Sequence, residues 1–317
     1  MSTRALVTGV CGFIGSRLAE SLLSKGYSVI GVDSFLDSYP REIKEDRLAD
    51  LTPRQGFDFV EADLTQVDLG ELLDGVSYIF HLAAQAGVRT SWGQRFEVYA
   101  NANILSTQKL LEAAKRKSLK RFVYSSSSSV YGSIEIMPTP EEAPLQPLSP
   151  YAVTKLAGEH LCELYRINYQ VPVVVLRYFT VYGPKPRPDQ AVCIFTRALI
   201  EENKIQMYGD GEQLRGMTYV DDVVRANLLA SQKDCIGEIF NIGGGSSITM
   251  NQLIAQLEKL TGAKSNIQYV DPIEGDARHT LAEIKKALEV LEWSPKVSIE
   301  EGLKQSVNSI RRYYYDN

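Results

Sequence analysis

Short runs of aliphatic and β-branched residues recur along the first half of the chain, and amphipathic stretches separate them. Apolar residues repeat at helical spacing in the stretches Phe13–Lys25 and Asn103–Lys117, which predicts a helix over each. Strands that alternate with helices favour a parallel sheet with helices on both faces, so we predict a doubly wound α/β fold. The predicted strands are Arg4–Thr8, Ser28–Val32, Asp58–Glu61, Tyr78–Leu82, Arg121–Ser125 and Val171–Leu176.

The pattern becomes irregular after about Tyr178, where a segment rich in proline and glycine (Tyr182–Asp189) precedes another helical stretch and a glycine loop (Gly209–Gly216). This change predicts a smaller α/β lobe grafted onto the sheet domain. Two later segments, which begin at Thr218 and Glu238, are typical of a helix and a strand that return to the sheet. We therefore expect a sheet domain of residues 1–178, rejoined by about 218–242, and a discontinuous lobe of residues 179–217 and 243–317.

Composition limits the function classes that are open to this chain. The 317 residues are 44% hydrophobic and 23% charged with a net charge of −5, which excludes a disordered chain and disfavours nucleic acid and anionic membranes as partners. The four cysteines are far apart, so we expect reduced thiols and neither a zinc site nor a disulfide scaffold. No apolar run reaches the roughly 18 residues of a membrane span, and a cytoplasmic location is the expectation.

A glycine array follows the first predicted strand and opens the first helix at Phe13. Gly9, Gly12 and Gly15 allow a tight turn and a close approach of the backbone to a pyrophosphate, whose charge the helix N-terminus stabilises. Asp33 ends the second predicted strand, where a carboxylate accepts hydrogen bonds from an adenosine ribose and repels a 2′-phosphate. The combination predicts a Rossmann-type site that prefers NAD to NADP.

A tyrosine and a lysine share one face of a later predicted helix. Ser149 is the expected N-cap and Pro150 the first residue of this helix, which places Tyr151 and Lys155 four residues apart. A phenol with an ordinary pKa of about 10 needs a nearby ammonium to act as a base near neutral pH, and Lys155 supplies one. Ser127, at the carboxyl end of the predicted fifth strand, is placed to share a proton with Tyr151 and a substrate hydroxyl.

Nearly the whole chain resembles the extended short-chain dehydrogenase/reductases, specifically the NAD-dependent nucleotide-sugar epimerases and dehydratases. The motifs that carry the resemblance are TGVCGFIGS, Asp33, ADL, HLAA, Asn103, SSSSSVYG, YAVTK, RYFTVYGP, YGDG, TYVDD, FNIGGG and EGDARHT. It implies NAD as cofactor, a UDP-sugar as substrate, and a homodimer through the apolar faces near Ile104 and Leu156.

The resemblance also assigns roles to individual positions. Asp63 and Leu64 match adenine contacts, and Tyr178 matches a neighbour of the nicotinamide. Arg215 matches the cation for the pyrophosphate of the nucleotide sugar, and Asp276 matches the acceptor for the uridine ribose. The cofactor set is Gly9, Gly12, Phe13, Ile14, Gly15, Asp33, Asp63, Leu64, Ala83, Asn103, Tyr151, Lys155 and Tyr178. The substrate set is Arg89, Ser127, Ser128, Ser129, Tyr151, Thr180, Arg187, Tyr208, Arg215, Asp276 and Arg278.

The residues after Ser127 bear on the reaction. Related 4,6-dehydratases carry an Asp-Glu pair just before VYG, and related UDP-glucuronate decarboxylases carry a Glu there. This chain has Ser128 and Ser129 at those positions, and neither can do carboxylate acid–base work. Epimerases of plain hexoses usually have Asn where this chain has Thr180. Three hydroxyls and Arg187 suit a sugar carboxylate, so the resemblance is closest to UDP-glucuronate 4-epimerases.

Such an epimerase oxidises carbon 4 transiently, lets the 4-keto sugar rotate, and returns the hydride to its other face, with Tyr151 moving the proton of the 4-hydroxyl. A UDP-glucose or UDP-N-acetylglucosamine 4-epimerase is the alternative. A UDP-glucuronate decarboxylase or a non-catalytic NAD-binding regulator fits the motifs less well.

Overall fold

The chain was analysed as a computed structural model, which describes residues 3–272, 275 and 277–316. Seven parallel strands form the central sheet in the order β10-β6-β5-β4-β1-β2-β3, and this arrangement confirms the predicted doubly wound α/β fold. The strands are β1 (Arg4–Thr8), β2 (Ser28–Asp33), β3 (Phe57–Glu61), β4 (Tyr78–His81), β5 (Arg121–Ser127), β6 (Val173–Tyr178) and β10 (Ile239–Ile242).

Strand β6 begins later than predicted. The prediction started at Val171, but Pro172 has no N–H to give to a sheet ladder, and β6 runs from Val173 to Tyr178. Strand β10 pairs with β6 in parallel, so the segment after Glu238 does add the last strand to the sheet. The division of the chain into a sheet domain and a discontinuous lobe stays a prediction.

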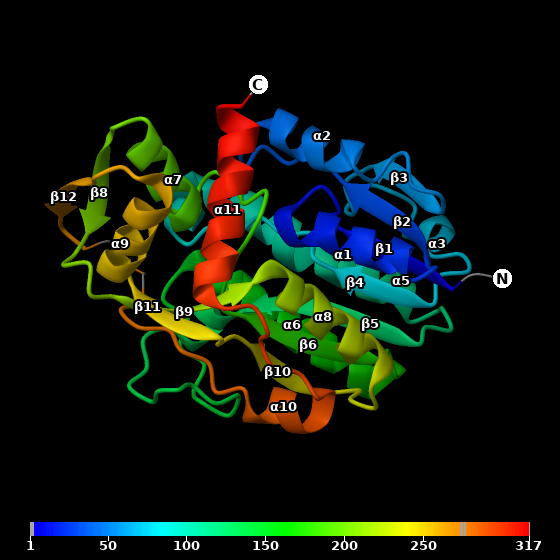
Figure 1. Cartoon of the computed structure of the whole chain (residues 1–317). Coiled ribbons are helices and arrows are strands. Elements are labelled where there is room, and N and C mark those ends of the chain that lie inside the picture. The colour runs from blue at the N-terminus through cyan, green and yellow to red at the C-terminus, as the bar shows by residue number, and fades with distance from the viewer. Residues whose placement is uncertain (1–2, 273–274, 276, 317) are drawn as a thin grey trace.

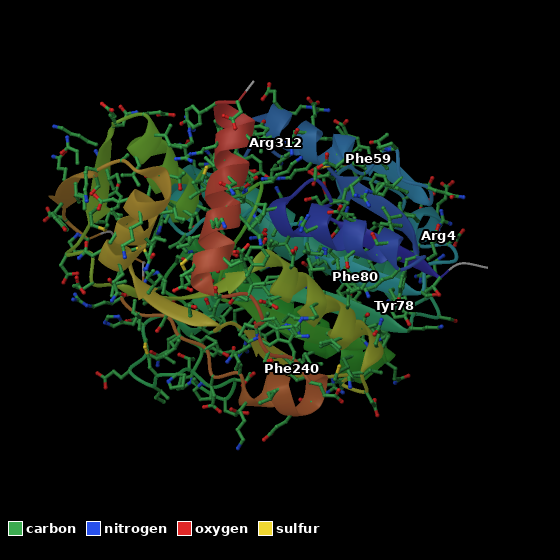
Figure 2. All side chains as sticks on the ribbon, viewed as in Figure 1. Arg4, Phe59, Tyr78, Phe80, Phe240 and Arg312 are labelled. Atoms are coloured by element: carbon green, nitrogen blue, oxygen red, sulfur yellow. The ribbon has the colours of Figure 1, made fainter. Side chains whose placement is uncertain are left out.

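Alternate residues of each strand pack into two hydrophobic cores, one on each face of the sheet. Val7 and Phe80 pack on one face of the sheet, and their neighbours Leu6 and Ile79 pack on the other. Phe80 and Phe240, which are labelled in Figure 2, belong to the same core. Because both faces are covered, the strands read as continuous apolar runs rather than as alternating ones.

Helices α1 (Phe13–Ser24) and α8 (Val220–Gln232) cover the near face of the sheet in Figure 1, and α5 (Ser106–Ala114) and α6 (Pro150–Tyr169) cover the far face. Three short helical segments also belong to this half, namely α2 (Arg41–Ala49), α3 (Leu69–Leu72) and α4 (Phe96–Tyr99).

The predicted helix over Asn103–Lys117 was only partly right. A π-helical turn over Ala100–Leu105 precedes α5, which ends at Ala114. The π turn includes Asn103, whose side chain reaches the loop after β4 and bonds the backbone of Gln85.

The predicted lobe lies mostly to the left in Figure 1, with α11 (Ile299–Tyr314) running between it and the central sheet. It holds two small sheets, with strand orders β11-β9-β7 and β12-β8. Its remaining elements are β7 (Thr180–Tyr182), α7 (Ala191–Ile200), β8 (Lys204–Tyr208), β9 (Leu214–Tyr219), β11 (Ser246–Thr249), α9 (Met250–Thr261) and β12 (Asn266–Val270). Helix α10 (Lys285–Leu291) falls within the range predicted for the lobe, but it packs against β10 and α8, below the sheet in Figure 1. Within the described part of the chain, none of the helices combines the length and the apolar character of a membrane span.

Candidate active site

The glycine positions of the loop between β1 and α1 leave no room for a side chain. Gly9 has a φ of +69°, and a Cβ on it would lie 2.8 Å from the backbone nitrogen of Ala83. A Cβ on Gly15 would lie 2.2 Å from the carbonyl oxygen of Gly9, and Gly12 is the N-cap of α1. The chain thus forms a bare backbone cradle at a helix N-terminus, and this cradle fits the pyrophosphate of NAD.

Asp33 ends β2 beside this cradle. Its carboxylate is buried and accepts hydrogen bonds from the backbone N–H groups of Cys11 (3.0 Å) and Phe35 (2.9 Å). These bonds tie the glycine loop to β2 and fix the direction of the acid. A carboxylate has about four acceptor positions, so Asp33 keeps acceptor capacity for ribose hydroxyls.

The other predicted cofactor residues lie after the next strands of the sheet. Leu64, after β3, is buried, while Asp63 is exposed and accepts a hydrogen bond from the backbone N–H of Thr65 (2.7 Å). Ala83 follows β4 and faces the glycine loop. Phe13 and Ile14 begin α1.

Asn103 and Tyr178 use their polar atoms within the protein. The Asn103 amide exchanges two hydrogen bonds with the backbone of Gln85 (2.8 and 3.0 Å) and donates to Thr154 of α6 (2.8 Å). The Tyr178 hydroxyl donates to Asn227 Oδ1 (2.9 Å) and lies 3.0 Å from Ser125 Oγ. Asn103 therefore links the loop after β4 to α6. Because the hydroxyl of Tyr178 is already hydrogen-bonded within the protein, its ring is the part that would contact a nicotinamide.

Helix α6 begins as predicted. Ser149 caps it by accepting from the N–H of Ala152 (3.2 Å), and Pro150 is its first residue. Tyr151 stands in the first turn and lies edge-on to Tyr99, with ring centroids 6.2 Å apart. The local cap and the fixed φ of proline thus place Tyr151 at the carboxyl edge of the sheet.

Ser127 joins the phenol to the serine run. Its hydroxyl is hydrogen-bonded to Tyr151 and accepts from the side chain (2.9 Å) and the backbone N–H (3.2 Å) of Ser129. Ser128 and Ser129 begin the 3-10 turn Ser128–Tyr131, and both are half-buried. The structure therefore brings Ser127, Ser129 and Tyr151 together.

Opposing influences act on the proton of Tyr151. Burial is the largest of them and holds the pKa of the phenol above its ordinary value, while the hydrogen bond with Ser127 and the charge of Arg187 partly offset this rise. The sequence assigned this acidifying charge to Lys155, and Arg187 was not part of that expectation. Burial lowers the pKa of Lys155 to about 8, and its ammonium lies 4.8 Å from the centroid of the Tyr124 ring.

The loop between β7 and α7 carries Arg187 to this place. Arg187 forms a two-pronged ion pair with Asp189, with both N–O distances 3.0 Å. Thr180 begins β7 with an exposed side chain, two residues beyond Tyr178, which is paired in register with Ser127. Thr180 and Arg187 thus enter from the lobe side of the edge where Ser127 and Tyr151 meet.

A second group of predicted residues lies around the end of β8. The guanidinium of Arg89 stacks over the ring of Tyr208 at 4.4 Å from its centroid, which joins the loop after β4 to the end of β8. Arg278 pairs with Asp210 (2.8 Å), and Arg215 donates to the backbone carbonyl of Arg278 (2.9 Å). The predicted Asp276 lies outside the described residues.

Two buried cations near the site were missed by sequence reasoning. Arg177 forms a buried ion pair with Glu159 of α6 (2.7 Å), and Glu159 also accepts from Ser126. A charged residue four positions after Lys155, on a helix that faces the sheet, was an available signal. Arg47 of α2 is also buried and hydrogen-bonded, but α2 reads as a polar helix and gave no such signal.

The sequence model of the NAD dependent epimerase/dehydratase family matches residues 5–243. A UDP-glucuronate 4-epimerase of Thermodesulfobacterium geofontis is 42% identical, and the alignment covers 96% of this chain and 94% of that protein.

Solved structures agree. The UDP-glucuronic acid 4-epimerase of Bacillus cereus, in complex with UDP-glucuronic acid and NAD, is 41% identical with a TM-score of 0.96, over 98% of this chain and 100% of that one. A UDP-glucose 4-epimerase of Thermotoga maritima with UDP-glucose is 38% identical with a TM-score of 0.90, over 98% and 99% of the two chains. These relatives confirm the predicted resemblance and NAD as the cofactor. The chain belongs to the NAD dependent epimerase/dehydratase family.

Proposed function

We propose that the protein is a UDP-glucuronate 4-epimerase, which interconverts UDP-glucuronate and UDP-galacturonate. The observation that carries the proposal is the grouping of a hydroxyl-only serine run and Arg187 around Tyr151. Hydroxyl donors and a guanidinium together suit a sugar that carries a carboxylate beside the reacting carbon.

The residues divide the work of moving one proton. When bound, NAD supplies the hydride acceptor and donor, so that the sugar passes through a 4-keto form with no net redox change. Tyr151 takes the proton of the 4-hydroxyl and later returns it, and Ser127 holds the phenol by a hydrogen bond. Arg187 favours the phenolate by its charge. Lys155, buried one turn along α6, is proposed to hold the nicotinamide ribose and to supply a second positive charge.

The residues around the sugar must also prevent decarboxylation of the 4-keto intermediate. A 4-keto uronic acid is a β-keto acid, which loses carbon dioxide when its carboxylate is aligned for that step. Ser128, Ser129 and Thr180 offer neutral hydroxyls, and none of them supplies the acid or base that the dehydratase and decarboxylase motifs carry. We propose that they hold the carboxylate, with Arg187, away from the decarboxylating alignment.

A specific feature favours a second candidate, a UDP-glucose 4-epimerase. Arg187 already has a carboxylate partner in Asp189, so its charge is matched before any substrate binds. The similarity to the T. maritima UDP-glucose 4-epimerase points the same way. A sugar carboxylate must therefore share Arg187 with Asp189, whose side chain is 51% exposed, or displace it.

The assembly and location are also proposals. Leu156 packs inward and Ile104 is half-buried, so the exposed stripe on α6 runs instead through Val153, Leu164 and Ile167. We propose a homodimer through this stripe, and Leu164→Glu should shift the protein to a monomer in sedimentation velocity. A cytoplasmic location is supported by four buried, unpaired cysteines.

Product identification tests the reaction. The purified enzyme, with no added reductant, is incubated with UDP-glucuronate, UDP-glucose and UDP-N-acetylglucosamine separately, and the products are separated and assigned by NMR. We expect UDP-galacturonate to form fastest. A UDP-pentose as the main product would show a decarboxylase, and the absence of any product with all three sugars would show a non-catalytic protein.

A further inference from the structure

The loop that carries Arg187 is held from the cofactor side of the molecule. Arg47, on α2, is buried and donates through Nη2 to the backbone carbonyls of Lys185 (3.0 Å) and Pro186 (3.1 Å). Through Nη1 the same guanidinium donates to the carbonyl of Cys11 in the glycine loop (3.2 Å). One side chain therefore spans the loop that cradles the pyrophosphate and the loop that reaches the sugar.

A second anchor fixes the same loop from two sides. The ammonium of Lys185 lies 2.7 Å from a carboxylate oxygen of Asp46 and 2.7 Å from one of Asp50, both at the α2 end of the sheet domain. The backbone N–H of Lys185 donates to Ser309 of α11 (2.9 Å), and Lys185 has a φ of +52°. Such a non-glycine residue in the left-handed region persists only where its surroundings fix it.

Tyr39 is a further partner of Arg47. Its hydroxyl accepts from Arg47 Nη1 (2.7 Å), and it lies close enough to Arg187 for that charge to act on its phenol. Arg187 in turn acts on Tyr151. Arg47 therefore contacts the glycine loop, Tyr39 and the loop that carries Arg187.

We propose that Arg47 is a positioning residue that links the glycine loop to the loop carrying Arg187 and thereby sets the selectivity for a 6-carboxylate. This inference rests on the proposed function. A planar guanidinium makes these four bonds in one fixed geometry, whereas a lysine ammonium offers three donors from a single point and cannot span both loops.

The test compares the ratio of kcat/KM for UDP-glucuronate to that for UDP-glucose in NAD-loaded enzymes. Arg47→Lys keeps the charge and removes the fork, and we expect the ratio to fall about tenfold. Arg187→Met alone should lower the ratio at least as much. In the Arg187→Met background, Arg47→Lys should then change the ratio little, because Arg47 is proposed to act through the guanidinium of Arg187, which that background already lacks. Arg54→Lys, at an arginine paired with Glu20 of α1, is the matched control and should leave the ratio unchanged.

Different outcomes separate the two proposals. If Arg187→Met leaves the ratio of the two kcat/KM values unchanged, the proposed function is wrong, whatever the Arg47 variant does. If Arg187→Met lowers the ratio but Arg47→Lys slows both sugars equally, or if the two effects multiply in the double variant, Arg47 has only a structural role and the inference is wrong. If thermal melting shows that Arg47→Lys does not fold, Lys185→Ala is tested instead. It removes the second anchor, and by itself it must lower the ratio of kcat/KM for UDP-glucuronate to that for UDP-glucose.

Discussion

Tyr151 is a buried phenol whose hydrogen bond to Ser127 and neighbouring Arg187 both favour its ionised form. Burial opposes them and is the largest influence, so the pKa of Tyr151 stays above its ordinary value. The Tyr151–Lys155 motif could be predicted because a helix sets its spacing locally, and Ser127 because it lies at the carboxyl end of a predicted strand, at the edge of the sheet. Arg47 could not, since its partners lie 36 and 139 residues away and only tertiary packing brings them together.

Removing the phenol should remove the proton transfer and little else. We expect Tyr151→Phe to lower kcat by roughly 10² to 10⁴ while UDP-sugar binding, measured by calorimetry, stays near that of the wild type. Tyr169→Phe, at the exposed end of the same helix, is the control and should be fully active. Near-normal turnover of Tyr151→Phe would remove Tyr151 from the mechanism.

The titration of Lys155 should make both kcat/KM and the free energy of unfolding depend on pH. Burial lowers its pKa to about 8, so its ammonium is lost as the pH rises through that value, and kcat/KM should fall there. Because the unfolded chain keeps this proton up to about pH 10.4, the same group makes the free energy of unfolding rise between the two values.

Lys155→Arg keeps a charge that does not titrate in this range, and it should abolish the alkaline fall in kcat/KM even if the rate is lower throughout. An identical alkaline limb in both enzymes would assign the titration to a different group.

At the scale of elements, the central sheet was predictable because most of its strands are runs of buried apolar residues between turns, and β3 (Phe57–Glu61), which has no fully buried residue, still carries three apolar ones. Strands β7, β8, β9, β11 and β12 were not predicted. Strand β12 (Asn266–Val270) shows why, since it is mostly exposed and pairs with β8, so tertiary pairing rather than a sequence pattern makes it a strand. The π turn at Asn103 likewise follows from contacts to Gln85 that periodicity does not reveal.

The turn between β1 and α1 gives a prediction about one element. Gly15→Ala adds a Cβ 2.2 Å from the carbonyl oxygen of Gly9, so the loop must open and the backbone cradle is lost. We expect the variant to be purified with far less NAD than the wild type, measured after denaturation.

Gly302→Ala is the matched control for this prediction. It is also a helical glycine with a clash, at 2.4 Å from the Tyr182 hydroxyl, but it lies in α11. It should lower the melting temperature and retain NAD. Equal NAD content in the wild type and Gly15→Ala would contradict the assignment of the glycine loop.

At the scale of the whole molecule, we propose that the predicted sheet domain and the predicted lobe each provide part of the site. Ser127 and Tyr151 come from β5 and α6, whereas Thr180 and Arg187 arrive on the segment that leads from β6 into α7. The lobe also contributes Tyr208, which Arg89 of the sheet domain contacts across the two parts. We therefore expect the choice of sugar to depend on how the two parts are held together, and not on the proton-transfer residues alone.

The most direct measurement is the ratio of kcat/KM for UDP-glucuronate to that for UDP-glucose, in the wild type and in Thr180→Val. A hydroxyl lost from a charged partner costs about 1.5 to 3 kcal/mol, or roughly ten- to a hundredfold. We predict that the wild type prefers UDP-glucuronate and that Thr180→Val lowers the ratio by that factor with little effect on UDP-glucose. A wild type that prefers UDP-glucose, or a ratio that Thr180→Val leaves unchanged, would contradict the uronate pocket and favour a UDP-glucose 4-epimerase.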